Sequence, residues 1–173
     1  MTTRHLLPTG DQLMLQTYLN DHRAGAAAGL ALCERLAASN EGTPLGATVS
    51  EICAEIAEDA TSLDHVIEHL RLHQNPLKRT IALAGERVGR LKLNGQLTGY
   101  SPLSRLLEIE SLLAGIDAKR SLWKSLLAVS PEGRVGDADL RQLIARADSQ
   151  RERLLSHHDE AASQALAGLV EPA

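Results

Sequence analysis

The chain has 173 residues, which is the size of one domain and long enough to bury a core without metals or disulfides. Hydrophobic residues make up 43% of the sequence, but aromatic residues only 2% and Phe is absent, so Leu, Ala, Ile and Val must fill the core. That composition favours packed helices over a sheet. The formal net charge of -4 is spread along the chain, which argues against a nucleic-acid-binding surface.

The hydropathy of the chain predicts a protein without a membrane span. No apolar run approaches the roughly 20 residues that a spanning helix needs, and the first residues lack the apolar run of a signal peptide. We therefore expect a soluble, cytoplasmic protein. Its predicted organisation is a polar lead over residues 1–10, one helical-bundle domain over residues 11–168 and a tail over residues 169–173.

The first predicted helix covers residues 11–38. Its inward face follows alternating steps of three and four residues: Leu15, Leu19, His22, Ala26, Gly29, Cys33 and Leu36. Asp21 and His22 place polar groups on this face. Gly25 and Gly29 each cost about 1 kcal/mol in helix propensity relative to Ala. Close approach of a neighbouring helix is the simplest feature that would offset this cost, and we expect it here.

The second predicted helix covers residues 45–72 and follows a turn at residues 39–44, so it folds back against the first. Its apolar stripe comprises Leu45, Val49, Ile52, Ile56, Leu63, Ile67 and Leu70. Asp59 falls inside this stripe, whereas Glu55 lies on its flank. A carboxylate among aliphatic side chains needs a partner for its charge.

A short basic helix is predicted over residues 77–93, after Asn75-Pro76 ends the second helix. At about 1.5 Å per residue it spans roughly 25 Å, enough to carry the chain back along most of a bundle. We expect its five positive charges to form a solvated face, although an anionic partner or a membrane surface could bind them. Its thin apolar stripe and Tyr100 are candidates for a homodimer contact.

The third and fourth long helices are predicted over residues 102–128 and 137–168. Ser101 and Pro102 supply a cap and a favourable first residue for the third helix, and Lys119 lies on the border of its apolar stripe. With the basic helix as a crossover, the third helix runs parallel to the second. The expected fold is an all-α four-helix bundle made of two hairpins and a short crossover helix.

The two cysteines, Cys33 and Cys53, lie within apolar helical patterns. Their spacing is not typical of zinc or redox motifs. We therefore expect reduced, packed side chains, as in a cytosolic protein.

The predicted arrangement resembles the ferritin-like fold, in which a long crossover joins two helical hairpins that carry inward polar residues halfway along. The resemblance covers about residues 11–168 and is carried by this architecture and by segments 18–29 and 51–59. Metal-binding members of that family place a Glu on each of two helices and a Glu-x-x-His pair on each of the others, which hold two irons. No histidine of this chain has an acidic residue three positions earlier. The resemblance therefore implies a degenerate member without the di-iron motif.

Helix registers predict a polar layer at the centre of the bundle. If the first two helices meet near residue 41, Asp21 and His22 lie one turn from Asp59, and a third helix parallel to the second brings Lys119 to the same height. Tyr18 is near enough to donate a hydrogen bond. We expect Lys119 and His22 to neutralise the two carboxylates, because buried charges persist only when paired.

Two other interpretations of the polar residues stay open. Asp21, His22, Glu55 and Asp59 could instead bind one metal ion, iron or manganese, or a small polar ligand. A second polar layer nearer the other end would combine Arg105, Glu108 and His158 close to Cys33 and Ser50, and packing around a satisfied histidine is its expected role.

Three functions follow from these patterns. The favoured one is a non-enzymatic binding or structural module, with a buried polar network in place of a di-metal site, no catalytic residue and no cofactor. Its rival is a ferritin-like metal-binding protein or di-iron oxidase with atypical ligands. The third is a helical scaffold that binds a protein partner as a dimer. The small-molecule or protein partner is not identified by the sequence.

Overall fold

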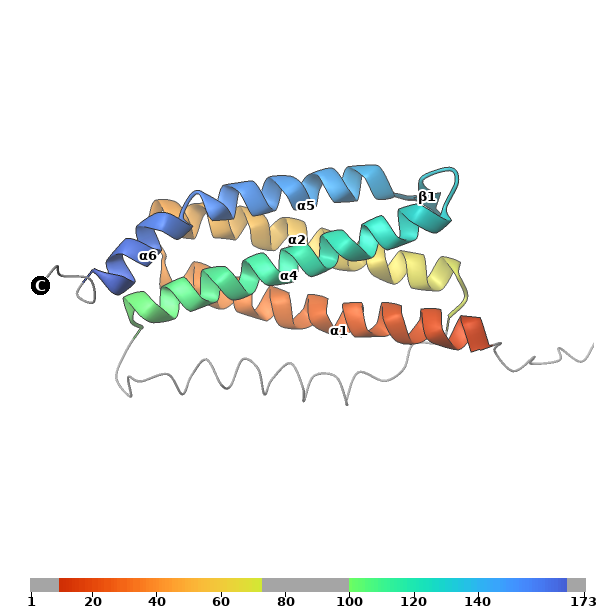
Figure 1. The fold of residues 1–173 in the computed structure, drawn as a ribbon, viewed down its shortest axis with the longest axis horizontal. Helices are drawn as coiled ribbons and strands as arrows, with labels where there is room; N and C mark the ends of the chain where they lie inside the picture. The colour runs from red at the N-terminus through yellow and green to blue at the C-terminus, as the bar shows by residue number, and fades with distance from the viewer. Residues whose placement is uncertain (1–9, 73–99, 168–173) are drawn as a thin grey trace, which may run out of the picture.

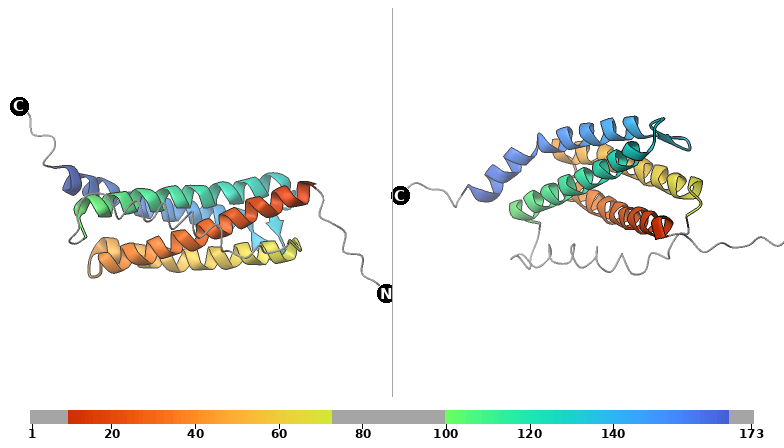
Figure 2. Two further views of the ribbon diagram at one scale, coloured as in Figure 1. Left: turned by 90° about the horizontal axis from the view of Figure 1, so that it is seen from below. Right: turned by 45° about the vertical axis from the view of Figure 1, so that its right-hand side comes forward.

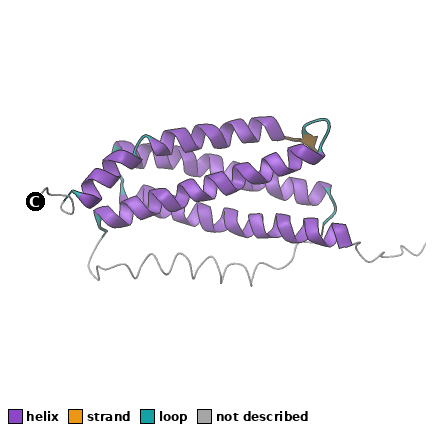
Figure 3. Ribbon diagram, in the orientation of Figure 1, coloured by secondary structure: helices purple, strands orange, loops and turns teal. Residues whose placement is uncertain are grey.

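The computed structural model describes residues 10–72 and 100–167, which are nearly all helical (Figure 3). The helices are α1 (Gly10–Ser39), α2 (Pro44–His69), α4 (Pro102–Val129), α5 (Leu140–Leu155) and α6 (His158–Leu166). One small antiparallel sheet, β1 (Arg134–Val135) with β2 (Ala138–Asp139), joins α4 to α5. The all-α prediction is confirmed, and the predicted connector over residues 77–93 lies outside the described residues.

Capping side chains set the starts of two long helices. Thr43 Oγ1 accepts a hydrogen bond from the Gly46 amide at 3.1 Å before α2, and Ser101 Oγ accepts one from the Ser104 amide at 3.1 Å before α4. A proline follows each cap at the first helical position, where an N–H is not needed. Helices α1, α2 and α4 lie close to their predicted ranges.

The prediction of one continuous final helix over residues 137–168 is wrong at its start, where the chain forms a hairpin, and in its middle, where the helix is interrupted. Residues 134–139 form the β1–β2 hairpin, whose turn has a left-handed backbone at Gly136 with φ of 57°. The Asp139 carboxylate then caps α5 by accepting hydrogen bonds from two amides of its first turn. The chain turns again after Leu155, so α6 is a separate helix, which packs against α4.

Contacts made by α1 fix the directions of its two neighbours. The contacts that establish the register are Tyr18 with Ser125 and Arg35 with Glu108 for α4, and Arg23 with Asp64 and Cys33 with Cys53 for α2. Both neighbours therefore run antiparallel to α1 and parallel to each other, as Figures 1 and 2 show. The predicted parallel course of these two helices is confirmed. Helix α5 completes the bundle by packing against α4 and α2.

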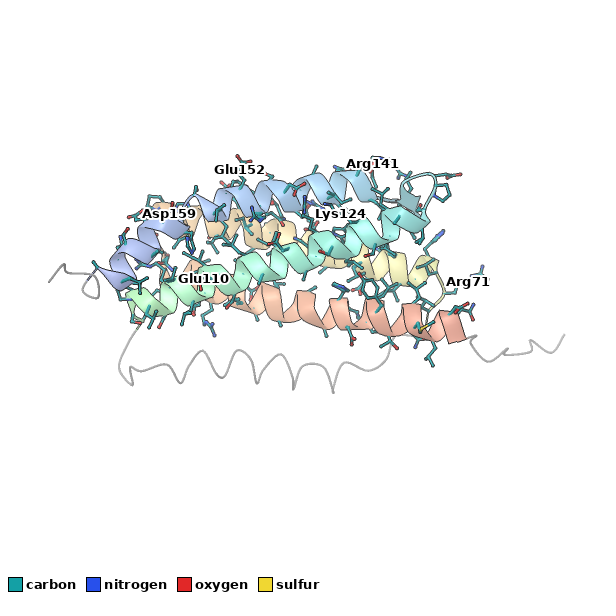
Figure 4. The ribbon with its side chains drawn as sticks, viewed as in Figure 1. Arg71, Glu110, Lys124, Arg141, Glu152 and Asp159 are labelled. Carbon is teal, nitrogen blue, oxygen red and sulfur yellow. A yellow bond between two sulfur atoms is a disulfide. The ribbon has the colours of Figure 1, made fainter. Side chains whose placement is uncertain are left out.

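The hydrophobic core is divided into two clusters along the bundle. The first cluster includes Cys33, Leu36, Ile52, Ile56, Leu112 and Ile116. The second cluster includes Leu19, Leu63, Ile67, Leu122, Trp123 and Leu140. Asp59 of α2 and Lys119 of α4 lie between the residues that their helices give to the two clusters. In contrast, charged residues such as Glu110, Lys124 and Glu152 lie on the outside of the bundle (Figure 4).

The prediction that Cys33 and Cys53 are reduced is wrong, because they form a disulfide between α1 and α2. Their Cα atoms lie 5.6 Å apart, a distance that suits a disulfide. Spacing along the chain did not indicate this pair. Antiparallel packing of the two helices brings together residues that are 20 positions apart.

Reduction of the disulfide is expected to lower the free energy of unfolding by about 3 kcal/mol, because the bond closes a loop of roughly 20 residues and restricts the unfolded chain. Urea unfolding with and without a reductant measures the change. The Cys33→Ser/Cys53→Ser variant is the control, since its stability should not respond to the reductant. Equal stability of the oxidised and reduced wild-type protein would contradict the bond.

Candidate functional site

The central polar layer is built around the carboxylate of Asp59, which is only 2% exposed. Its Oδ2 accepts a hydrogen bond from Lys119 Nζ at 2.5 Å, and its Oδ1 lies 2.6 Å from Arg146 Nη2. Gln150 of α5 completes the layer: its Oε1 accepts from Lys119 Nζ at 2.5 Å and its Nε2 donates to Asp59 Oδ2 at 3.4 Å. Two cations and an amide therefore surround one carboxylate.

The charges around this layer are balanced by acidic residues at its edge. Two flanking ion pairs are Arg146 with Glu58 at 2.6 Å and Arg153 with Glu55 at 2.5 Å. Burial lowers the pKa of the Lys119 ammonium, and the adjacent Asp59 carboxylate opposes that shift. The arrangement is an ion-pair network in which each buried charge meets an opposite charge.

The α1 residues predicted in this layer lie differently. Asp21 is exposed, so its predicted place beside Asp59 is wrong. Consecutive helix residues are about 100° apart, and it is His22 that takes the inward position. His22 is half-buried, and its ring makes a T-shaped contact with the ring of Tyr18, with 4.7 Å between the centroids. Tyr18 is itself 36% exposed and donates a hydrogen bond to Ser125 Oγ at 3.2 Å.

Sequence reasoning missed both α5 members of the layer, Arg146 and Gln150. Gln150 is fully buried, and it continues the helical spacing of Leu143 and Ala147. A strict count along that stripe would have found it. Arg146 gives no such signal, because it reaches Asp59 from the edge of the stripe.

A cavity of about 110 Å³ lies beside the polar layer, between α1, α2 and α4. Its principal lining residues are His22, Gly25, Ala26 and Gly29 of α1, Ile56, Asp59, Ala60 and Leu63 of α2, and Leu112, Gly115, Lys119, Leu122 and Trp123 of α4. Most of these side chains are apolar. The cavity lies at the height where the two core clusters are separated. The space is left because α1 supplies only small residues and one histidine there.

Within residues 10–72 and 100–167, no helix approaches Gly25 or Gly29 closely, contrary to the prediction for these two glycines. A Cβ atom at either position would meet no atom of the described residues within 4 Å, and the same holds for Gly115 across the cavity. Gly25 and Gly115 are exposed, so these glycines leave the cavity open to solvent between α1 and α4. Among the described helical glycines, Gly46 permits close approach, because a Cβ there would overlap the backbone of Asn40 in the α1–α2 turn.

Trp123 carries a buried polar atom that has no partner among the described residues. Its side chain lines the cavity and is 1% exposed, and its indole Nε1 is buried without a hydrogen-bond acceptor among the described residues. A buried donor left without an acceptor costs about 1–3 kcal/mol. His22 also lines the cavity, and burial lowers its pKa against the opposing charge of Asp21, so its imidazole is mostly neutral at pH 7.

The second predicted layer, of Arg105, Glu108 and His158, does not form. Glu108 instead accepts hydrogen bonds from Arg35 Nε at 2.9 Å and from the Tyr100 hydroxyl at 3.2 Å. Burial raises the pKa of Glu108, with the Arg35 charge opposing the shift. Arg105 lies over the Tyr100 ring, 5.9 Å from its centroid, and His158 contacts carboxylates at the surface.

The four candidate metal ligands are not brought together. Asp21 is exposed, Glu55 pairs with Arg153, and cations contact both oxygens of Asp59. Across residues 10–72 and 100–167 no three His, Cys, Asp or Glu side chains are placed to hold a metal ion. The donors in the described part of the chain therefore do not fit the alternative of an iron or manganese site.

The fold and the site define an all-α bundle with an ion-paired central layer and an apolar cavity beside it. No helix in the described part of the chain is long and apolar enough to cross a membrane. No family model, curated protein or solved structure matches the chain. The function has to be argued from the layer and the cavity.

The Asp59→Leu variant is expected to have a free energy of unfolding about 3–5 kcal/mol below that of the wild-type protein. The substitution removes the buried counter-charge of Lys119 and Arg146. Lys119→Met should cost less, since Arg146 still faces Asp59. The double variant should lose less than the sum of the single losses. Urea unfolding of the four proteins measures this coupling, and strictly additive losses would contradict a buried ion pair.

His22 and His158 are expected to affect stability in different pH ranges. Because the folded pKa of His22 is lowered, the unfolded chain binds its proton first, and stability is lost as the pH falls below about 6.5. Hydrogen bonds to Asp159 and Glu110 raise the pKa of His158, so its stabilising effect is present at low pH and lost as the pH rises above about 6.5.

Urea unfolding at a series of pH values checks both signs. His22→Gln should reduce the loss of stability that the wild-type protein shows as the pH falls below about 6.5. His158→Gln should remove the loss that the wild-type protein shows as the pH rises above about 6.5. Each variant serves as the control for the other. Identical changes in the two pH profiles would contradict the opposite pKa directions.

Proposed function

We propose that the protein is a non-enzymatic, ferritin-like helical bundle that binds a small apolar molecule in the cavity between α1, α2 and α4. The cavity itself carries this proposal, because Gly25, Gly29 and Gly115 leave apolar space that larger side chains could fill. An apolar cavity of about 150 Å³ in another protein binds benzene. The cavity of about 110 Å³ is smaller than that, but it is open to solvent beside the exposed Gly25 and Gly115, so a molecule of about six carbon atoms can extend beyond it.

The ferritin-like assignment is supported by the directions of the helices and the place of the polar layer. Helices α2 and α4 run parallel, and the layer lies between the two core clusters. In this proposal the pairing of Asp59 with Lys119 and Arg146 takes the place that a metal centre holds in other members of that superfamily. The network then stabilises the bundle, and the binding surface lies beside it.

The competing function is a metal-binding protein or di-iron oxidase. Protein purified without a histidine tag is expected to contain no stoichiometric metal, because cations of the chain contact both oxygens of Asp59. Elemental analysis of the purified protein measures this. Stoichiometric iron or manganese that is lost in Asp59→Ala would contradict the proposal and favour the metal-dependent function.

Two earlier predictions about partners and location stay untested. The predicted homodimer contact falls largely on residues 77–93, outside the described part of the chain, and Tyr100 is bonded to Asn40 and Glu108. The cytoplasmic prediction relied partly on reduced cysteines, and the disulfide between Cys33 and Cys53 removes that support.

Cyclohexane is a suitable probe of the cavity because it has six carbon atoms and no polar group. At ten times its dissociation constant it is expected to stabilise the wild-type protein by about 1.4 kcal/mol, or to raise Tm by about 3 °C. Gly115→Leu should abolish this shift, since its side chain enters the space left by the glycine. Thermal unfolding with and without cyclohexane measures the effect.

Ala114→Leu provides the matched control on α4. Ala114 is exposed and does not line the cavity, so its variant should keep the wild-type response to cyclohexane. Gly115→Leu should also remain folded, because leucine is the better helix former and its Cβ meets open space. No response of the wild-type protein to cyclohexane, or an equal response of Gly115→Leu, would contradict ligand binding in the cavity.

A further inference from the structure

A second cavity lies at the end of the bundle where α1 turns into α2. Its volume is about 250 Å³, and it is bounded by this turn, the start of α4 and helix α6, which meet at one end of the bundle (Figure 1). Arg105, Glu160 and Gln164 give its wall three polar side chains. None of the described residues lines both this cavity and the apolar one beside Asp59. The two cavities are therefore separate candidate sites.

The three polar side chains are joined head to head along the wall of the second cavity. Glu160 and Gln164 are four residues apart on α6, so they share one face of that helix. Gln164 Oε1 accepts a hydrogen bond from Arg105 Nη1 at 2.7 Å, and Gln164 Nε2 donates one to Glu160 Oε1 at 3.0 Å. Because all three residues line the cavity, this row of head groups forms part of its wall.

The charges of Arg105 and Glu160 are not neutralised by ion pairs within residues 10–72 and 100–167. The amide of Gln164 lies between them and keeps them apart. The second support of the Arg105 guanidinium is also uncharged, since its Cζ lies over the Tyr100 ring, 5.9 Å from the centroid. Arg146, in contrast, contacts carboxylates directly. One wall of the cavity thus carries a cation and an anion that both lack a counter-charge there.

We infer that this cavity binds a small zwitterion of the amino-acid class, with its carboxylate against Arg105 and its ammonium group against Glu160. An ion with a single charge would be attracted by one of these side chains and repelled by the other, whereas a zwitterion meets an opposite charge at each end. Because an amide separates the two side chains, the charges of the ligand are separated by several carbon atoms. The inference concerns a different cavity from the proposed function and does not rest on it.

Three probes of equal chain length test the need for both charges: 4-aminobutyrate, butyrate and butylammonium. Titration of the full-length protein, followed by proton–nitrogen correlation spectra at low ionic strength, measures their affinities. 4-Aminobutyrate is expected to bind at least about fivefold more tightly than either single-charge probe, because it gains one more ion pair near the surface. Equal affinities for the three probes, or tighter binding of a single-charge probe, would overturn the inference.

Two variants test the roles of the charged side chains separately. In Arg105→Gln the affinity for 4-aminobutyrate should fall to that for butylammonium, since the carboxylate loses its partner. In Glu160→Gln it should fall to the affinity for butyrate, since the ammonium group loses its partner. Glu160 is exposed, so its variant is expected to remain folded. If either variant keeps the fivefold preference for the zwitterion, the inference is wrong.

Lys124→Gln and Glu152→Gln are the matched controls, because they remove the same charges from exposed residues outside the cavity (Figure 4). Both should keep the preference of the wild-type protein for 4-aminobutyrate. Loss of the preference in these controls would assign it to the overall charge of the protein and overturn the site. The response to cyclohexane tests the other cavity, so the failure of one proposal is distinguishable from the failure of the other.

Discussion

Burial of the Asp59 carboxylate is the constraint on which the rest of this bundle depends. Removing an ionised carboxylate from water costs several kcal/mol unless opposite charges and hydrogen bonds surround it. Lys119 of α4 and Arg146 and Gln150 of α5 must therefore reach the same height on α2. Aliphatic side chains tolerate sliding of one helix past another far better than such a network does. The layer thus sets the relative positions of three helices.

Helix α1 contributes no charged side chain to that layer, and this asymmetry creates the cavity. At the height of Asp59, α1 presents His22 followed by Gly25, Ala26 and Gly29. Small residues neither neutralise the layer nor fill the space beside it. Between the two core clusters there is consequently an apolar cavity on the α1 side and an ion-pair network on the α5 side.

Helical periodicity and capping residues were sufficient to predict α1, α2 and α4, and a register argument placed Lys119 beside Asp59. Other features depend on orientation in three dimensions. Asp21 was assigned to the core because it adjoins His22, although a single step around the helix carries it to solvent. The disulfide required knowledge of how α1 packs on α2. The unpaired donor of Trp123 has no sequence signal, since it depends on which acceptors surround the indole.

The disulfide divides α1 into two halves with different restraints. Cys33 ties the C-terminal half to α2 covalently, whereas the half that contains Gly25 and His22 is held by side-chain contacts and by the Arg23–Asp64 ion pair. Regions with few buried contacts undergo local opening at a lower free energy than the whole domain. Local opening of α1 is therefore expected to begin in its N-terminal half, because only the other half is linked covalently to α2.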